Sequence, residues 1–172
     1  IAIFHRLMEK LKLDDDLKEE IRWCIEIKNY PALNDLVDSC LVPQDADMIK
    51  QLPRLFGSEE VFDQAIALFH DEKITETVEY LRSIFNDLQQ LGLKDKISVD
   101  LGIVNRANYY TGVLFRGYIT GFGQAVLSGG RYDKLLSEFG MPCPATGFGM
   151  NLDAILVSLL GNTPVKRSFL PE

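Results

Sequence analysis

At about residue 97 the spacing of apolar residues changes, and this change restricts the fold more than any other feature of the chain. From residue 1 to about residue 91, apolar residues recur at helical spacing, without the sustained alternation that predicts strands. Over residues 97–103, apolar residues instead alternate with polar residues or glycine, which predicts a strand with one buried face. A helical part is therefore expected to precede a part built largely from strands.

The helical part is divided by capping and terminating residues. Asp14, Asp15 and Asp16 predict an N-cap and a negatively charged first turn for the helix that follows them. The same triplet could indicate a metal site, but adjacent carboxylates seldom converge on one ion without a dedicated loop, so capping is favoured. Ser58 is predicted to cap a later helix, and Gly92 to end the last one. The predicted helices cover residues 1–11, 17–28, 32–40, 44–51, 59–69 and 74–91.

In the second part, glycines separate short segments of strand character. A hairpin is predicted at Gly121-Phe122-Gly123, and Gly129-Gly130 is predicted to end a strand and to start a helix that runs through Phe139. Asn151 is predicted to cap a final helix. The predicted strands are 97–103, 110–119, 124–128 and 145–150, with an extended tail over 161–172.

Composition argues against several classes of protein. The net charge of −7, with scattered Lys and Arg, disfavours a nucleic-acid surface, which must neutralise phosphates with clustered cations. Cys24, Cys40 and Cys143 form no CxxC pair, so neither a disulfide framework nor a zinc ribbon is indicated. Without an apolar run of bilayer length or a secretion signal, a cytoplasmic location is expected. Because the chain starts within a helical pattern and without Met, we expect a piece of a longer protein.

Common catalytic arrangements find little support in the sequence. His5 and His70 lie on helical stretches away from the glycine-rich half, which disfavours a histidine base, a metal pair or a Cys–His nucleophile. Gly147-Phe148-Gly149 begins like a dinucleotide fingerprint, but Leu152 stands where the third glycine belongs. We therefore predict no metal, no cofactor and no catalytic residue.

Two glycine-rich and aromatic segments, residues 108–112 and 128–133, predict a pocket for a small amphoteric molecule. Paired glycines allow a ligand to approach the backbone, tyrosines offer a flat apolar wall with a polar tip, and an arginine can bind a carboxylate through two hydrogen bonds. Each residue also has a plain structural explanation. The tyrosines could pack in a core, the glycines could form bulges or turns, and Arg131 and Asp133 could begin a surface helix.

Four short segments and one phenylalanine together carry a resemblance to a known family. In chain order they are Asp100-Leu101-Gly102-Ile103-Val104, Tyr109-Tyr110-Thr111-Gly112, Phe115, Gly129-Gly130-Arg131-Tyr132-Asp133-Lys134-Leu135 and Pro144-Ala145-Thr146-Gly147-Phe148. They resemble the C-terminal part of the histidyl-tRNA synthetase catalytic core. They also resemble the non-catalytic relative of that enzyme, the regulatory subunit of ATP phosphoribosyltransferase. The specific part of the resemblance covers about residues 99–156.

The resemblance implies an α+β fold, with a class II aminoacyl-tRNA synthetase-like antiparallel sheet and flanking helices behind a helical subdomain. The implied division is a helical subdomain at 1–93, the C-terminal part of a catalytic-type domain at 94–160 and a tail at 161–172.

Two departures favour the regulatory relative. Synthetases of this family carry an arginine before the two tyrosines that acts on the substrate carboxylate and the α-phosphate, whereas Asn105 stands here. Arg106 is adjacent, but a slip of one residue on extended backbone sends a side chain to the opposite face. The ATP-binding arginine of the last helix is replaced by Ala154. Without both cations, the charge stabilisation that activates a triphosphate is missing.

The resemblance thus implies a chain without catalytic activity of its own that acts in histidine biosynthesis. It would bind a short-form ATP phosphoribosyltransferase catalytic subunit, support its activity and transmit feedback by histidine, as a homodimer within a hetero-oligomer. Membrane and nucleic-acid partners are not expected. Two alternatives stay open, a divergent or truncated histidyl-tRNA synthetase and an orphan amino-acid-binding interaction module of the same fold.

The resemblance also implies which residues line a histidine-like pocket, with at most one of the two tyrosines pointing straight into it. Whether histidine binds there or at a subunit interface stays open. The candidate ligand-binding residues are Tyr109, Tyr110, Gly129, Gly130, Arg131, Tyr132, Gly147 and Phe148.

Overall fold

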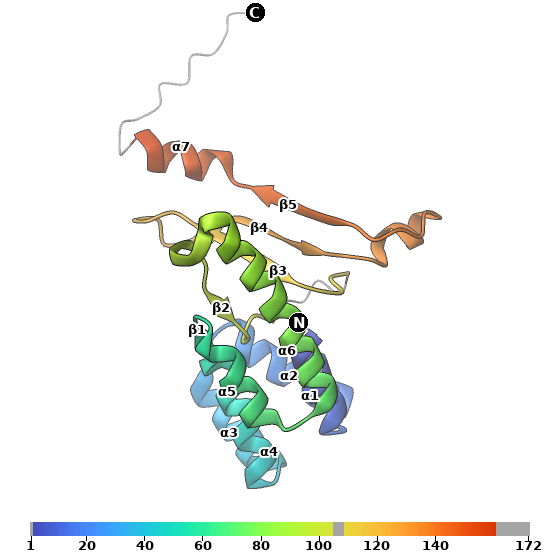
Figure 1. Cartoon of the computed structure of the whole chain (residues 1–172). Coiled ribbons are helices and arrows are strands. Elements are labelled where there is room, and N and C mark those ends of the chain that lie inside the picture. The colour runs from blue at the N-terminus through green and yellow to red at the C-terminus, as the bar shows by residue number, and fades with distance from the viewer. Residues whose placement is uncertain (1, 105–108, 161–172) are drawn as a thin grey trace, which may run out of the picture. The chain divides into compact units, whose positions relative to one another are not determined.

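The computed structural model describes residues 2–104 and 109–160 (Figure 1). The chain divides into two compact units, Ile1–Val113 and Leu114–Glu172. The tail predicted at 161–172 lies outside the described residues, as do residues 105–108. The domain boundary predicted at residue 93 stays a prediction.

The first unit is a bundle of helices, as the helical spacing of its apolar residues predicts (Figure 1). Each helix turns one apolar face inward, and Leu7, Ile21, Val37, Phe62 and Val78 are completely buried in the shared core. The helices are α1 (Ala2–Lys10), α2 (Asp15–Glu26), α3 (Tyr30–Cys40), α4 (Pro43–Gln51), α5 (Glu60–Phe69) and α6 (Glu72–Leu88). Short helical turns cover Leu52–Arg54, Gln89–Leu93 and Lys94–Lys96.

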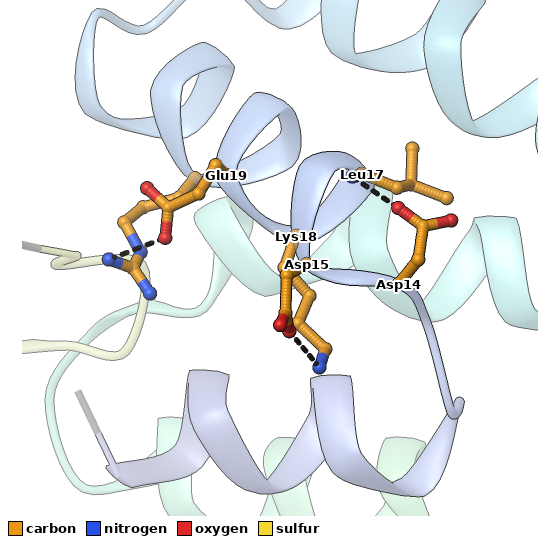
Figure 2. Close-up of polar contacts among 6 residues, drawn as sticks. Asp14, Asp15, Leu17, Lys18 and Glu19 are labelled. Carbon is orange, nitrogen blue, oxygen red and sulfur yellow. Dashed lines mark hydrogen bonds and ion pairs between the residues drawn. The ribbon is translucent and has the colours of Figure 1, made fainter.

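The predicted cap at the acidic triplet is confirmed. Asp14 is the N-cap of α2, and its carboxylate accepts a hydrogen bond from the N–H of Leu17 at 2.8 Å (Figure 2). Asp15 instead forms an ion pair with Lys18 at 2.9 Å within the first turn of the helix (Figure 2). Asp14 and Asp15 therefore have separate structural partners.

The cap predicted at Ser58 is wrong. Helix α5 begins at Glu60 with Glu59 in the N-cap position, and no side chain caps it. The N–H of Ser58 donates a hydrogen bond of 2.9 Å to the Glu60 carboxylate, which folds back over the helix start. The Glu60 carboxylate thus binds the backbone before the helix, and no serine hydroxyl caps the first turn.

The strand predicted at residues 97–103 is only partly present. Strand β2 (Val99–Asp100) pairs antiparallel with β1 (Phe56–Gly57) inside the first unit and is not part of the three-stranded sheet of the second unit. The N–H of Leu101 then donates to the carbonyl of Leu55 at 3.0 Å. Val99 and Leu101 are buried in the helical core, so burial against the helices fixes where this segment pairs.

The second unit is a three-stranded antiparallel sheet in the order β3-β4-β5, followed by a helix (Figure 1). The predicted hairpin between β3 and β4 is confirmed, because the N–H of Phe122 donates to the carbonyl of Ile119 at 3.0 Å and Gly121 adopts a φ of 84°. The elements are β3 (Leu114–Tyr118), β4 (Ala125–Arg131), a 3-10 helix (Leu135–Phe139), β5 (Thr146–Met150) and α7 (Leu152–Leu160).

The strand break predicted at Gly129-Gly130 is wrong. Both glycines are buried inside β4, the central strand, which continues through Arg131. The helix predicted to run from there through Phe139 is reduced to the 3-10 helix. At Gly129 the space beside the backbone is already filled by the carbonyl oxygen of Gly147 and by the side chains of Phe115 and Phe148.

The predicted cap of the final helix is confirmed. Asn151 Oδ1 accepts a hydrogen bond from the N–H of Ala154 at 3.0 Å, and the N–H of Asn151 donates to the carbonyl of Val126 at 2.8 Å. The start of α7 is therefore tied to β4. Within residues 2–104 and 109–160, no helix combines the length and the apolar character needed to cross a membrane.

Candidate functional site

Six of the eight predicted pocket residues lie close together in the second unit. Strand register places Gly129 opposite Phe148 and Gly130 opposite Gly147, on the neighbouring strands β4 and β5. Arg131 ends β4, and the N–H of Tyr132 extends the pairing by donating to the carbonyl of Ala145 at 2.8 Å. These six residues therefore form one continuous segment of sheet.

The same register divides these residues between the two faces of the sheet. Opposed residues in an antiparallel pair point to the same face, and successive residues point to opposite faces. Gly129 and Phe148 consequently share one face, while Gly130 and Gly147 share the other. A small ligand on one face cannot contact all six residues.

The face that contains Gly129 and Phe148 is aromatic. Phe115 on β3 also lies opposite Gly129, and a Cβ at position 129 would stand 2.7 Å from the Cζ of Phe115 and 2.6 Å from the Cβ of Phe148. The two rings are 36% and 63% exposed, respectively. Phe115 was not among the predicted pocket residues, although the hairpin at Gly121 fixes the register that brings it here. The absence of a side chain at Gly129 is thus required by packing alone.

The opposite face offers a polar group beside bare backbone. A Cβ at Gly147 would collide with the hydroxyl of Tyr132 and would lie 3.4 Å from its Cζ, so the phenol ring covers this glycine. Tyr132 is half-buried. A hydroxyl that can donate or accept a hydrogen bond therefore lies over Gly147, on the face that Gly130 shares.

Arg131 is held by an acidic neighbour within the chain. Its Nε lies 2.9 Å and 3.0 Å from the two carboxylate oxygens of Asp133, and both side chains are partly exposed. The pair fixes the direction of the guanidinium group. A pair of this exposure contributes little to stability, typically about 0–1 kcal/mol.

The two predicted tyrosines belong to the first unit. The ring centroids of Tyr109 and Tyr110 are 4.4 Å apart with an interplanar angle of 42°, and Tyr109 is exposed while Tyr110 is half-buried. The pairing of β4 with β5 connects the other six candidate residues and does not include Tyr109 or Tyr110. Asn105 and Arg106, which bear on the first missing cation, lie outside the described residues.

The second position that lacks a cation is well described. Ala154 lies in the first turn of α7, is 6% exposed, and its N–H is bound by the side chain of Asn151. If an arginine stood here, the packed surroundings would have to accommodate its long charged side chain. The surroundings of Ala154 therefore suit a small apolar residue.

His5 and Cys24 are titratable groups of the first unit with shifted pKa values. His5 lies on the exposed side of α1, where partial desolvation and then the Arg22 guanidinium lower its pKa. Burial raises the pKa of the Cys24 thiol, and the nearby Glu20 raises it further. In the part of the chain that the structure describes, no group of three or more His, Cys, Asp or Glu side chains is arranged to hold a metal ion.

Comparison with known proteins relates most of the chain to one family. The family model described as histidyl-tRNA synthetase matches residues 1–155. The ATP phosphoribosyltransferase regulatory subunit of Clostridium botulinum strain 657 is 38% identical over 161 residues, which are 92% of this chain and 38% of the relative. The protein of the same name from Clostridium kluyveri is 39% identical over 163 residues, or 93% of this chain and 42% of the relative. The chain thus spans about two fifths of the length of these curated relatives.

Solved structures confirm the predicted class II synthetase-like α+β fold. A structure from Bacillus halodurans described as an ATP phosphoribosyltransferase regulatory subunit/histidyl-tRNA synthetase has a TM-score of 0.86 and 30% identity, and the match covers 92% of this chain and 42% of that one. Histidyl-tRNA synthetase from Nostoc sp. PCC 7120 has a TM-score of 0.75 at 23% identity, covering 92% and 40% of the two chains, and shares the fold.

Proposed function

The chain belongs to the histidyl-tRNA synthetase family, and we propose that the protein containing it is a regulatory subunit of ATP phosphoribosyltransferase without catalytic activity of its own. In this role it binds a short-form catalytic subunit and is required for the condensation of ATP with phosphoribosyl pyrophosphate in histidine biosynthesis. It also transmits inhibition by histidine. The observation that carries the proposal is the shared name of relatives that are 36–41% identical over about nine-tenths of the chain.

The environment of Ala154 supports the absence of synthetase chemistry. Activation of an amino acid by ATP depends on cations that stabilise the charge developing on the phosphates, and such stabilisation is usually the largest catalytic term. Ala154 supplies none at a buried position where the resemblance implies an arginine. Binding of an amino acid does not need that cation, so a pocket can persist without the reaction.

For histidine we propose the face of the sheet that carries Tyr132. The Tyr132 hydroxyl can hydrogen-bond an amphoteric ligand on the face that Gly130 and Gly147 share, whereas the face with Phe115 and Phe148 presents two phenyl rings. Gly129 and Phe148 then shape the sheet from the other side. Tyr109 and Tyr110 remain proposed ligand contacts on the strength of the sequence alone.

Feedback by histidine sets a thermodynamic condition on this pocket. Histidine can inhibit the assembly only if it binds one conformational or assembly state more tightly than another. We propose that the protein forms a homodimer within a hetero-oligomer, so that occupancy of the pocket alters the contacts made with the catalytic subunit.

Complex formation tests the proposal. The full-length protein and the short-form catalytic subunit from the same organism are mixed and analysed by sedimentation velocity. A species heavier than either component alone is expected. If the two sediment independently at micromolar concentrations, the regulatory assignment is wrong, and an orphan amino-acid-binding module becomes the better interpretation.

A divergent histidyl-tRNA synthetase is the second candidate, favoured by the name of the family model and by the double description of the solved structure from Bacillus halodurans. It predicts exchange of labelled pyrophosphate into ATP when the full-length protein is incubated with histidine. We expect no exchange above background. Sustained, histidine-dependent exchange would establish the synthetase and overturn the regulatory proposal.

A further inference from the structure

An exposed stripe of acidic and apolar side chains runs along α2. Asp16, Glu20, Trp23 and Ile27 follow one another at steps of three and four residues, so they lie on one side of the helix and its C-cap. All four are exposed, and the two large apolar side chains are 43% and 46% exposed. We call these four residues the α2 stripe.

The core of the helical unit accounts for the other side of α2. Ile21, Cys24 and Ile25 are buried there and supply the packing that holds the helix in place. Trp23 and Ile27 project away from that side, one turn apart from each other. Large apolar side chains that remain exposed together on a well-packed helix are typical of a surface that binds another protein.

The charges around the stripe restrict what can bind. Glu26 is a further exposed acid beside Trp23. The first 113 residues contain 21 of the 25 acidic residues but only 13 of the 18 basic residues of the chain. This acidic surface repels nucleic acid and anionic membranes. Two copies of the stripe placed face to face would oppose like charges, which disfavours self-association through it.

We propose that the α2 stripe docks a basic protein surface, in which Lys and Arg side chains surround an apolar pocket that receives Trp23 and Ile27. We assign that surface to the ATP phosphoribosyltransferase catalytic subunit, an assignment that rests on the function proposed above. The aromatic side chain anchors the contact at its centre, and the acids Asp16, Glu20 and Glu26 steer the approach of the partner.

The test measures binding of the catalytic subunit to full-length protein by surface plasmon resonance at low and high salt. Trp23→Ala is expected to raise Kd by about 30-fold or more, mainly through faster dissociation, as for a buried aromatic anchor. Glu20→Lys combined with Glu26→Lys is expected to slow association and to weaken its salt dependence.

A second exposed helix surface supplies matched controls. Tyr80 and Glu76 lie one turn apart on α6 and are both exposed, so Tyr80→Ala removes an exposed aromatic ring and Glu76→Lys reverses an acidic charge away from the stripe. Both are expected to leave Kd within about twofold. Ile27→Ala, a smaller change at an exposed residue, provides a second stripe variant if Trp23→Ala lowers the melting temperature.

Each remaining outcome overturns a defined part of the proposal. If the wild-type protein binds and the stripe variants bind equally well, the docking site is wrong while the regulatory function stands. If the wild-type protein does not bind, both the function and the assigned partner are wrong. If stripe variants change self-association and leave partner binding unchanged, the occupant is a second copy of the protein. If the α6 variants lose as much affinity as the stripe variants, the effect does not belong to α2.

Discussion

Replacing Gly129 with alanine would place a methyl group in space that neighbouring atoms already occupy. The added Cβ would stand 2.6 Å from the Cβ of Phe148 and 2.7 Å from the Cζ of Phe115, and it would also collide with the carbonyl oxygen of Gly147. The phenyl ring can rotate away, but the carbonyl and the Phe148 Cβ move only with β5. Overpacking of this kind costs about 1–3 kcal/mol, and the rigid neighbours favour the upper half of that range.

The loss is partly offset in the unfolded chain. Alanine restricts the unfolded backbone more than glycine does, which favours folding by about 0.4–1 kcal/mol. We therefore expect Gly129→Ala to lower the free energy of unfolding by about 1–2.6 kcal/mol overall. The control is Gly149→Ala on β5, where a Cβ would meet no atom within 4 Å and φ is not positive. That variant is expected to be neutral or slightly stabilising.

Urea unfolding of the full-length protein and both variants, followed by circular dichroism, measures the difference. The account requires a lower midpoint for Gly129→Ala than for Gly149→Ala. Equal midpoints would refute the packing argument. Glycine at position 129 would then have to serve a ligand rather than the sheet, and histidine affinity would be the property to change.

Three further predictions concern a cap, a carboxylate and the proposed pocket. Asp14→Ala removes the side-chain acceptor for the Leu17 N–H and should destabilise the protein by about 1 kcal/mol. Asp16→Ala leaves that cap in place and should destabilise the protein less. Equal losses of stability in thermal unfolding would contradict the role of the cap. The Ser58 N–H holds the pKa of the Glu60 carboxyl below its ordinary value of 4.5. The hydrogen bond therefore stabilises the protein fully above pH 4.5, and this stabilisation is lost as the pH falls through the lower pKa of the folded state. Glu60→Gln should lose less stability over that range in acid unfolding, and an unchanged pH dependence would argue against the hydrogen bond. Tyr132→Phe keeps the ring over Gly147 but removes the hydroxyl, so calorimetry of the full-length protein should show histidine binding weakened by about 0.5–1.5 kcal/mol. Phe148→Leu on the other face should leave histidine binding nearly unchanged. The opposite ranking of the two variants would move the ligand to the phenyl face.

Local sequence signals predicted much of the fold. Helical spacing identified the bundle, and short polar side chains next to apolar runs identified the caps at Asp14 and Asn151. The relationship to histidyl-tRNA synthetases and to ATP phosphoribosyltransferase regulatory subunits, predicted from the four motif segments, is confirmed by the family model and by the curated relatives. These features depend on residues close together in the chain, where a single sequence carries the information.

The errors arise where distant residues decide the outcome. Gly129 and Gly130 have the local character of a strand break, but pairing on both sides and the rings of Phe115 and Phe148 keep them inside β4. The residues around Val99 alternate between apolar and polar, as in a sheet strand, but burial of Val99 against the helical core pairs this segment with β1. Local propensity cannot reveal these neighbours.

The candidate site shows the same limit. Its residues were predicted as one group, and strand register then placed Gly129 and Phe148 on one face and Gly130 and Gly147 on the other. The alternation of side chains along a strand could have separated them, but the helix predicted after Gly130 concealed that alternation. Their role in binding a ligand stays a prediction.

The central claim is that the protein regulates a catalytic subunit and does no chemistry itself. Its most direct test is the rate of phosphoribosyl transfer to ATP by the short-form catalytic subunit, measured with and without the full-length protein and across a range of histidine concentrations. We predict that transfer depends on the added protein, saturates with its concentration and is inhibited by histidine. A catalytic subunit that is equally active and equally sensitive to histidine alone would contradict the account.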